Sequence, residues 1–102
     1  MPDEETYLIK LTLVRHDLME HASPAEVAVF RKHYERLRWE RDRGRVLLAG
    51  PCLDGAFGII VFRAPSEDKA RRFMEEDPTA AAGLMHAQLH PFRVSLATWQ
   101  DT

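Results

Sequence analysis

The sequence has one cysteine, no long hydrophobic run and almost no excess of either charge. Cys52 alone cannot form an intramolecular disulfide, which favours a reducing compartment. The longest apolar stretch, residues 57–62, is far shorter than the roughly 20 residues that a bilayer span needs. The net charge of -2 gives no bulk attraction to nucleic acid or to an anionic membrane. These features predict a protein that binds neither of them.

The start of the chain does not have the pattern of a signal peptide. Residues 1–5 are mostly acidic and lack the basic-then-apolar pattern of a signal peptide, so we expect a cytoplasmic protein with a disordered N-terminus. The composition that remains is ordinary for a soluble domain, with 45% hydrophobic and 29% charged residues. The length of 102 residues predicts a single domain over residues 1–102.

Hydrophobic periodicity predicts alternating strands and helices. Apolar and polar residues alternate near the start of the chain, which is typical of a half-buried strand. Val27, Phe30, Tyr34 and Leu37 recur at spacings of three and four, which is typical of a helix that packs on one side. The predicted elements are a strand at residues 7–14, a helix at 24–43, strands at 45–50 and 57–62, a helix at 67–76 and a last strand within 86–97.

Helix boundaries are marked by capping residues. Ser23 and Glu26 form a capping box around Pro24, which suits the first helical position. Gly44 favours the left-handed conformation that ends a helix. Ser66 is placed to cap the second helix. These signals support both predicted helices.

The order β-α-β-β-α-β predicts an α+β, ferredoxin-like domain with a four-stranded antiparallel sheet and its helices on one face. In this topology the second and fourth strands lie at the edges, which suits Pro51 and Pro91 because proline lacks the amide donor that a central strand needs. The uncovered face would expose Leu8, Val14 and one side of the third strand. A contiguous apolar face usually binds a partner. We therefore predict a homodimer that pairs its open sheet faces.

His33 and Asp77 are the candidate catalytic residues. A histidine and a carboxylate can move protons near neutral pH where the fold brings them together. His33 lies about 60° from Phe30 around the helix, at the margin of the buried side. Asp77 precedes Pro78 and can cap a short helical turn. A purely structural histidine and a purely capping aspartate are the alternatives.

Four motifs, in the right order, resemble the YciI-like (YCII-related) family. They are RKHYERL at residues 31–37, GRVLLAGP at 44–51, EDPTAAAG at 76–83 and HPF at 90–92. The resemblance implies a dimeric α/β barrel with a His–Asp pair in a cleft near the dimer interface, which serves as a catalytic or ligand site. Carried over residue by residue, it assigns the pair to His33 and Asp77, with Gly50 and Pro51 shaping the cleft.

Other polar residues give less specific signals. Arg15 and His16 follow the first strand and could bind an anionic group of a substrate, although a solvated loop is as good an interpretation. The remaining histidines, which include His86 and His90, have no companion cysteine pair, so we expect no metal site and no cofactor.

These observations predict a small-molecule-binding homodimer whose substrate the sequence does not name. If it is an enzyme, it transfers protons without a cofactor, as an isomerase or lyase does, with His33 as general base or acid and Asp77 orienting it. The alternatives are a non-catalytic ligand-binding or regulatory module and a structural homodimer.

Overall fold

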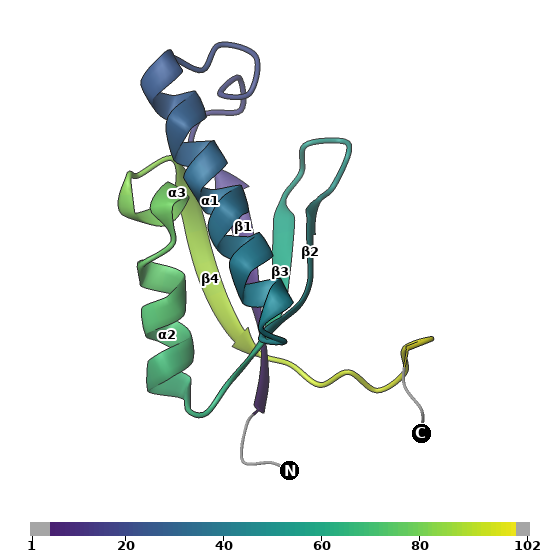
Figure 1. Cartoon of the computed structure of the whole chain (residues 1–102). Helices are drawn as coiled ribbons and strands as arrows, with labels where there is room; N and C mark the ends of the chain where they lie inside the picture. The colour runs from purple at the N-terminus through teal and green to yellow at the C-terminus, as the bar shows by residue number, and fades with distance from the viewer. Residues whose placement is uncertain (1–4, 100–102) are drawn as a thin grey trace.

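The computed structural model describes residues 5–99 as a four-stranded antiparallel sheet with helices on one face (Figure 1). Glu5 already belongs to the first strand, so the prediction of a disordered segment fails for this residue, and the rest of that segment, residues 1–4, lies outside the described part. In chain order the elements are β1 (Glu5–Leu13), α1 (Pro24–Asp42), β2 (Val46–Pro51), β3 (Gly58–Ala64), α2 (Glu67–Glu75), α3 (Pro78–Ala81) and β4 (Met85–Pro91).

The sheet has the strand order β2-β3-β1-β4, which confirms the ferredoxin-like prediction. β1 is central because it pairs with β3 on one side and β4 on the other, both antiparallel. The two predicted edge prolines, Pro51 and Pro91, end the edge strands β2 and β4. No helix within residues 5–99 is long and apolar enough to cross a membrane.

Both predicted helix caps are present. The Ser23 hydroxyl accepts the Glu26 amide hydrogen at 3.1 Å, and the Glu26 carboxylate accepts the Ser23 amide hydrogen at 2.9 Å, which completes the capping box of α1. The Ser66 hydroxyl accepts the Lys69 amide hydrogen at 3.2 Å and caps α2. α1 ends just before Gly44, whose φ of 83° only glycine adopts freely.

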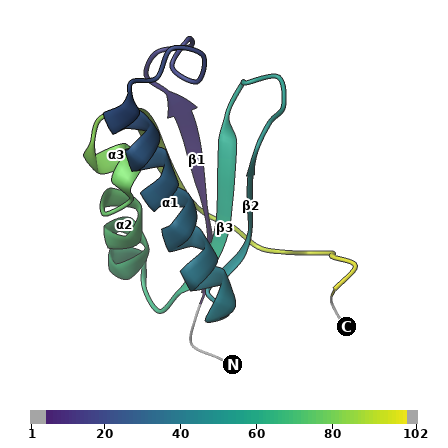
Figure 2. The same cartoon turned by 45° about the horizontal axis from the view of Figure 1, so that its top comes forward.

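The hydrophobic core lies between the helices and one face of the sheet (Figure 2). Tyr7 and Ile9 of β1 and Phe62 of β3 are almost fully buried there. The Phe62 ring lies 6.0 Å from the Tyr7 ring and 4.7 Å from the Phe73 ring of α2, measured between centroids. This contact fixes α2 on the sheet, and it therefore sets where the turn between α2 and α3 lies.

The opposite face of the sheet has two chemical characters. On the β2–β3 side it presents apolar residues, with Leu48 opposite Val61 and Val61 opposite Leu8 in the strand register. Leu48 is 39% exposed, whereas Val61 is buried by its neighbours. On the β4 side the face is polar, since the residues that alternate with the core-packed ones are His86, Gln88 and His90.

The last strand is shorter than its sequence pattern indicates. The alternation of apolar residues continues to Leu96, but β4 ends at Pro91. Pro91 pairs with Tyr7, and beyond this point β1 has only its first residues left, so the following segment runs out of a partner strand. Leu96 is consequently 91% exposed.

Candidate functional site

His33 and Asp77 contact each other directly in the helical layer. His33 lies in the middle of α1, and Asp77 lies in the turn between α2 and α3. The Nδ1 atom of His33 and the Oδ1 atom of Asp77 are 2.6 Å apart, which is a short hydrogen bond. The Asp77 side chain is 2% exposed and that of His33 is 14% exposed. The imidazole therefore lies at the boundary between core and solvent.

Local sequence explains why Asp77 is held so firmly. It is the N-cap of α3, and Pro78 occupies the first helical position, as predicted. Its Oδ2 atom accepts the amide hydrogen of Thr79 at 3.0 Å and also accepts the Thr79 hydroxyl hydrogen. One oxygen thus serves the cap and the other contacts His33, so the cap and the contact with His33 are compatible in one side chain.

The surroundings of Asp77 keep it ionised at neutral pH. Burial by itself would raise its pKa, but the hydrogen bonds from His33 and Thr79 outweigh this and leave the pKa below its ordinary value. An ionised carboxylate can only accept hydrogen bonds, so Nδ1 of His33 must be the donor. In a neutral imidazole the second nitrogen, Nε2, then carries the lone pair that can accept a proton.

Arg36 is a third charged member of the site. It lies one helical turn after His33, and its Nη1 atom is 3.8 Å from Oδ1 of Asp77. The guanidinium stacks over the Phe73 ring at 4.2 Å and lies 3.9 Å from the Glu76 carboxylate. Its buried Nη1 atom has no hydrogen-bond partner among the described residues. The fold therefore brings a cation close to Asp77 without letting it displace His33.

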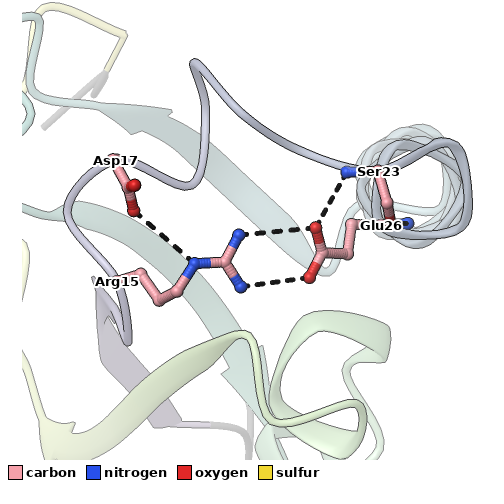
Figure 3. A network of polar contacts seen from close by, with 4 residues as sticks. All are labelled: Arg15, Asp17, Ser23 and Glu26. Atoms are coloured by element: carbon pink, nitrogen blue, oxygen red, sulfur yellow. Dashed lines mark hydrogen bonds and ion pairs between the residues drawn. The ribbon is translucent and has the colours of Figure 1, made fainter.

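The predicted anion-binding residues lie in the loop between β1 and α1, apart from the pair. Arg15 donates two hydrogen bonds to Glu26, at 3.2 and 3.5 Å, and its Nε lies 3.5 Å from Asp17 (Figure 3). These two carboxylates compensate the Arg15 charge. His16 is exposed in the same loop.

Gly50 and Pro51 lie exposed at the end of β2, opposite Ile59 and Gly58 of β3. Figure 1 shows this hairpin on the other side of α1 from α3. The predicted site residues consequently form two groups. One is the His33–Asp77 pair, and the other is a rim at one end of the sheet, which consists of Arg15, His16, Gly50 and Pro51.

His33 and Asp77 line neither of two hollows found within residues 5–99. The larger, of about 1130 Å³, lies between the C-terminal tail and the sheet, and its walls include Leu47, Arg63 and Trp99. The smaller, of about 290 Å³, lies near Met85 and His86. Within residues 5–99, no three His, Cys, Asp or Glu side chains gather in an arrangement that could hold a metal ion.

Sequence reasoning missed Arg36 and Thr79. Arg36 follows His33 by three positions and so shares its helix face, which is a signal the sequence does contain. Thr79 follows Asp77-Pro78, where a hydroxyl can reach back to the capping carboxylate. Their proximity to the His33–Asp77 pair becomes apparent only when α1 and the α2–α3 turn are known to be in contact.

The YCII-related domain profile matches residues 11–93 of the chain. No curated protein matches this chain significantly. Among solved structures, the fold is similar to that of 5-chloro-2-hydroxyhydroquinone dehydrochlorinase (TftG) from Burkholderia phenoliruptrix AC1100, determined in complex with 2,5-dihydroxybenzoquinone. The TM-score is 0.66 at 20% sequence identity, and the match covers 86% of this chain and 93% of that one. At this identity the likeness is one of fold.

Proposed function

This chain belongs to the YCII-related domain family, and on that premise we propose that it is a cofactor-independent enzyme that transfers a proton on a small molecule. The reaction class is isomerisation or elimination. The observation that carries the proposal is the 2.6 Å contact between His33 and a buried, ionised Asp77. The similar fold of a dehydrochlorinase supports the class, because loss of HCl needs a base and a leaving group but no redox cofactor.

The roles follow from the geometry of the pair. Asp77 holds the imidazole through Nδ1 and stabilises the imidazolium once it forms. His33 takes a proton from the substrate at Nε2. In an elimination, the electron pair left behind forms the new double bond while the leaving group departs with its own pair. His33 then returns its proton to water, or to the substrate in an isomerisation.

The rim residues have secondary roles in this proposal. Arg15 and His16 would bind an anionic oxygen of the substrate, and Gly50 and Pro51 would shape the wall opposite. Arg15 can do so only by sharing its guanidinium with Glu26 and Asp17. A phenolate or enolate suits this role, because a hydrogen bond from Arg to an ionised oxygen is charge-assisted.

We further propose a cytoplasmic homodimer that pairs its open sheet faces. The apolar half of the face, around Leu8 and Leu48, supports this assembly. The single cysteine supports the location. His33 and Asp77 lie on the covered side of the sheet, so such a dimer would leave the pair accessible from the helical layer.

The direct test is turnover of a chlorinated hydroquinone. Purified protein is incubated with 5-chloro-2-hydroxyhydroquinone, and chloride release is followed. We expect release above the uncatalysed rate, and a loss of about 10²- to 10⁴-fold in His33→Ala. His21→Ala, which alters an exposed loop histidine, is the matched control and should be fully active. Equal rates for His33→Ala and the native protein would refute the proposal.

A non-catalytic ligand-binding module is the second candidate, favoured by the similar fold of a protein solved in complex with 2,5-dihydroxybenzoquinone. Isothermal titration calorimetry with 2,5-dihydroxybenzoquinone separates the two. A module would bind this probe, lose affinity in His33→Ala and Asp77→Asn, and never release chloride. A purely structural subunit would bind nothing and would assemble normally in both variants.

A further inference from the structure

The unpaired guanidinium nitrogen of Arg36 calls for an explanation, because a buried donor without an acceptor is costly. The carboxylate oxygen Oδ1 of Asp77 is 3.8 Å away from it and is already engaged by His33 at 2.6 Å. Stacking on Phe73 holds the guanidinium in this position. The side chain is therefore fixed beside the carboxylate as a charge, without a hydrogen bond to it.

We propose that Arg36 is a positioning residue that acts as the permanent countercharge of Asp77 and so keeps His33 neutral and ready to accept a proton at Nε2. The inference rests on the proposed function for its meaning in catalysis. It concerns a property of the free protein, however, and is tested without any substrate.

Charge balance gives the physical reason. Without Arg36, a buried carboxylate would have only His33 as a possible cation, and this would favour the imidazolium, whose Nε2 already carries a proton. With Arg36 at 3.8 Å, the carboxylate already has a positive charge beside it. A second positive charge on His33 therefore gains less electrostatic stabilisation from the carboxylate. A general base that is protonated at rest cannot act as one.

Few other charges face the pair. The elements packed most closely on α1 are β2 and α3, and neither contains a titratable side chain. The turn between α2 and α3 adds Glu76, which lies 3.9 Å from Arg36 and is 63% exposed. Solvent screens that carboxylate far more than it screens Asp77. Arg36, at 3.8 Å from Oδ1, is thus the nearest cationic side chain to Asp77 after His33 among the described residues.

The test follows the His33 imidazole by NMR in ¹⁵N-histidine-labelled protein between pH 5 and 9. In Arg36→Met, which keeps an apolar stem against Phe73, we expect the pH midpoint of the imidazole to rise by about 1 unit. Arg36→Lys retains the charge and should restore the midpoint to within about 0.3 unit of the native value. Arg36→Gln replaces Arg36→Met should the latter not fold.

Arg43→Met is the matched control. Arg43 stacks on the Trp39 ring at 4.2 Å, the same separation as Arg36 from Phe73, but has no ion pair with Asp77. The Arg43→Met variant should leave the pH midpoint of the His33 imidazole unchanged. A midpoint in Arg36→Met that stays within about 0.2 unit of the native value would overturn the inference. A protein that releases no chloride but shows the expected shift would refute the proposed function alone.

Discussion

The Nδ1 atom of His33 and the Oδ1 atom of Asp77 lie 2.6 Å apart although the two residues are 44 positions apart in the sequence. The same carboxylate caps α3 through its other oxygen. Chemistry at His33 and the start of a helix therefore depend on one side chain, and substitutions at Asp77 can separate the two roles.

Asp77→Asn should retain much of the cap but remove the charge that orients and stabilises His33. We expect a loss of turnover of about 10²- to 10⁴-fold with only about 1 kcal/mol of destabilisation. Asp77→Ala should lose the cap as well and leave buried donors unpaired, at a cost of about 2–4 kcal/mol. Urea unfolding and chloride release measure the two effects. Equal stabilities for the two variants would show that the cap contributes nothing.

Thr79→Val should weaken the support of Asp77 without touching His33. Thr79 is fully buried, and its hydroxyl donates to Oδ2 of Asp77. Loss of this bond should cost about 1–2 kcal/mol, measured by urea unfolding. Thr79→Ser keeps the hydroxyl and should retain most of that stability. Thr12→Val, a half-exposed threonine of β1, is the control for the added methyl group. A larger loss in Thr79→Ser than in Thr79→Val would contradict this role.

Stability at acid pH should report the lowered pKa of Asp77. A carboxyl whose pKa is lower in the folded state stabilises the fold above its unfolded value of about 3.9, and this contribution disappears as the pH falls through the folded value. The difference in unfolding free energy between the native protein and Asp77→Asn should therefore shrink as the pH is lowered from 5 to 3. Chemical denaturation at four pH values across this range is the measurement. A constant difference would mean that Asp77 titrates alike in both states.

Arg15 offers a test of substrate anchoring. If it binds an anionic oxygen, Arg15→Gln should raise KM about 10-fold with little change in kcat, since it removes an interaction made equally in the ground and transition states. Asp17→Asn frees the guanidinium from one of its carboxylates and should lower KM. Steady-state kinetics on the chlorinated hydroquinone distinguishes these effects. An unchanged KM in both variants would mean that Arg15 has only a structural role, through its contact with Glu26.

The open sheet face offers a test of assembly. Leu48→Glu places a charge in the apolar half of that face, and we expect it to convert a dimer to a monomer in sedimentation velocity. Leu53→Glu alters a fully exposed residue of the β2–β3 hairpin and should leave the dimer intact. A native protein that sediments as a monomer, or a Leu48→Glu variant that still dimerises, would argue against pairing through this face.

The fold was predictable because its signals are local. The capping box of Ser23 and Glu26 acts within a few residues, and Pro51 and Pro91 favour edge strands wherever they fall in them. With the order of the elements, these signals predict the ferredoxin-like sheet that is present. The end of β4 was not predictable in this way. It depends on where β1 begins, and the alternation up to Leu96 carries no information about that partner.

The candidate site was predictable only in part. The sequence pointed to His33 by its place on the helix and to Asp77 by its cap, and the resemblance linked the two. The contact itself is present, whereas its catalytic role stays a prediction. Arg36 was not predicted, because its proximity to Asp77 arises only after Phe73 docks α2 and the turn beyond it comes to face α1.

The brevity of α3 has a practical consequence for handling the protein. A helix of four residues has little stability of its own, and short elements can open locally at temperatures where the rest of the domain stays folded. Opening of α3 would carry Asp77 away from His33 while hardly altering the circular dichroism signal. An assay that reports on the His33–Asp77 contact itself is therefore a better check of this part of the fold than circular dichroism.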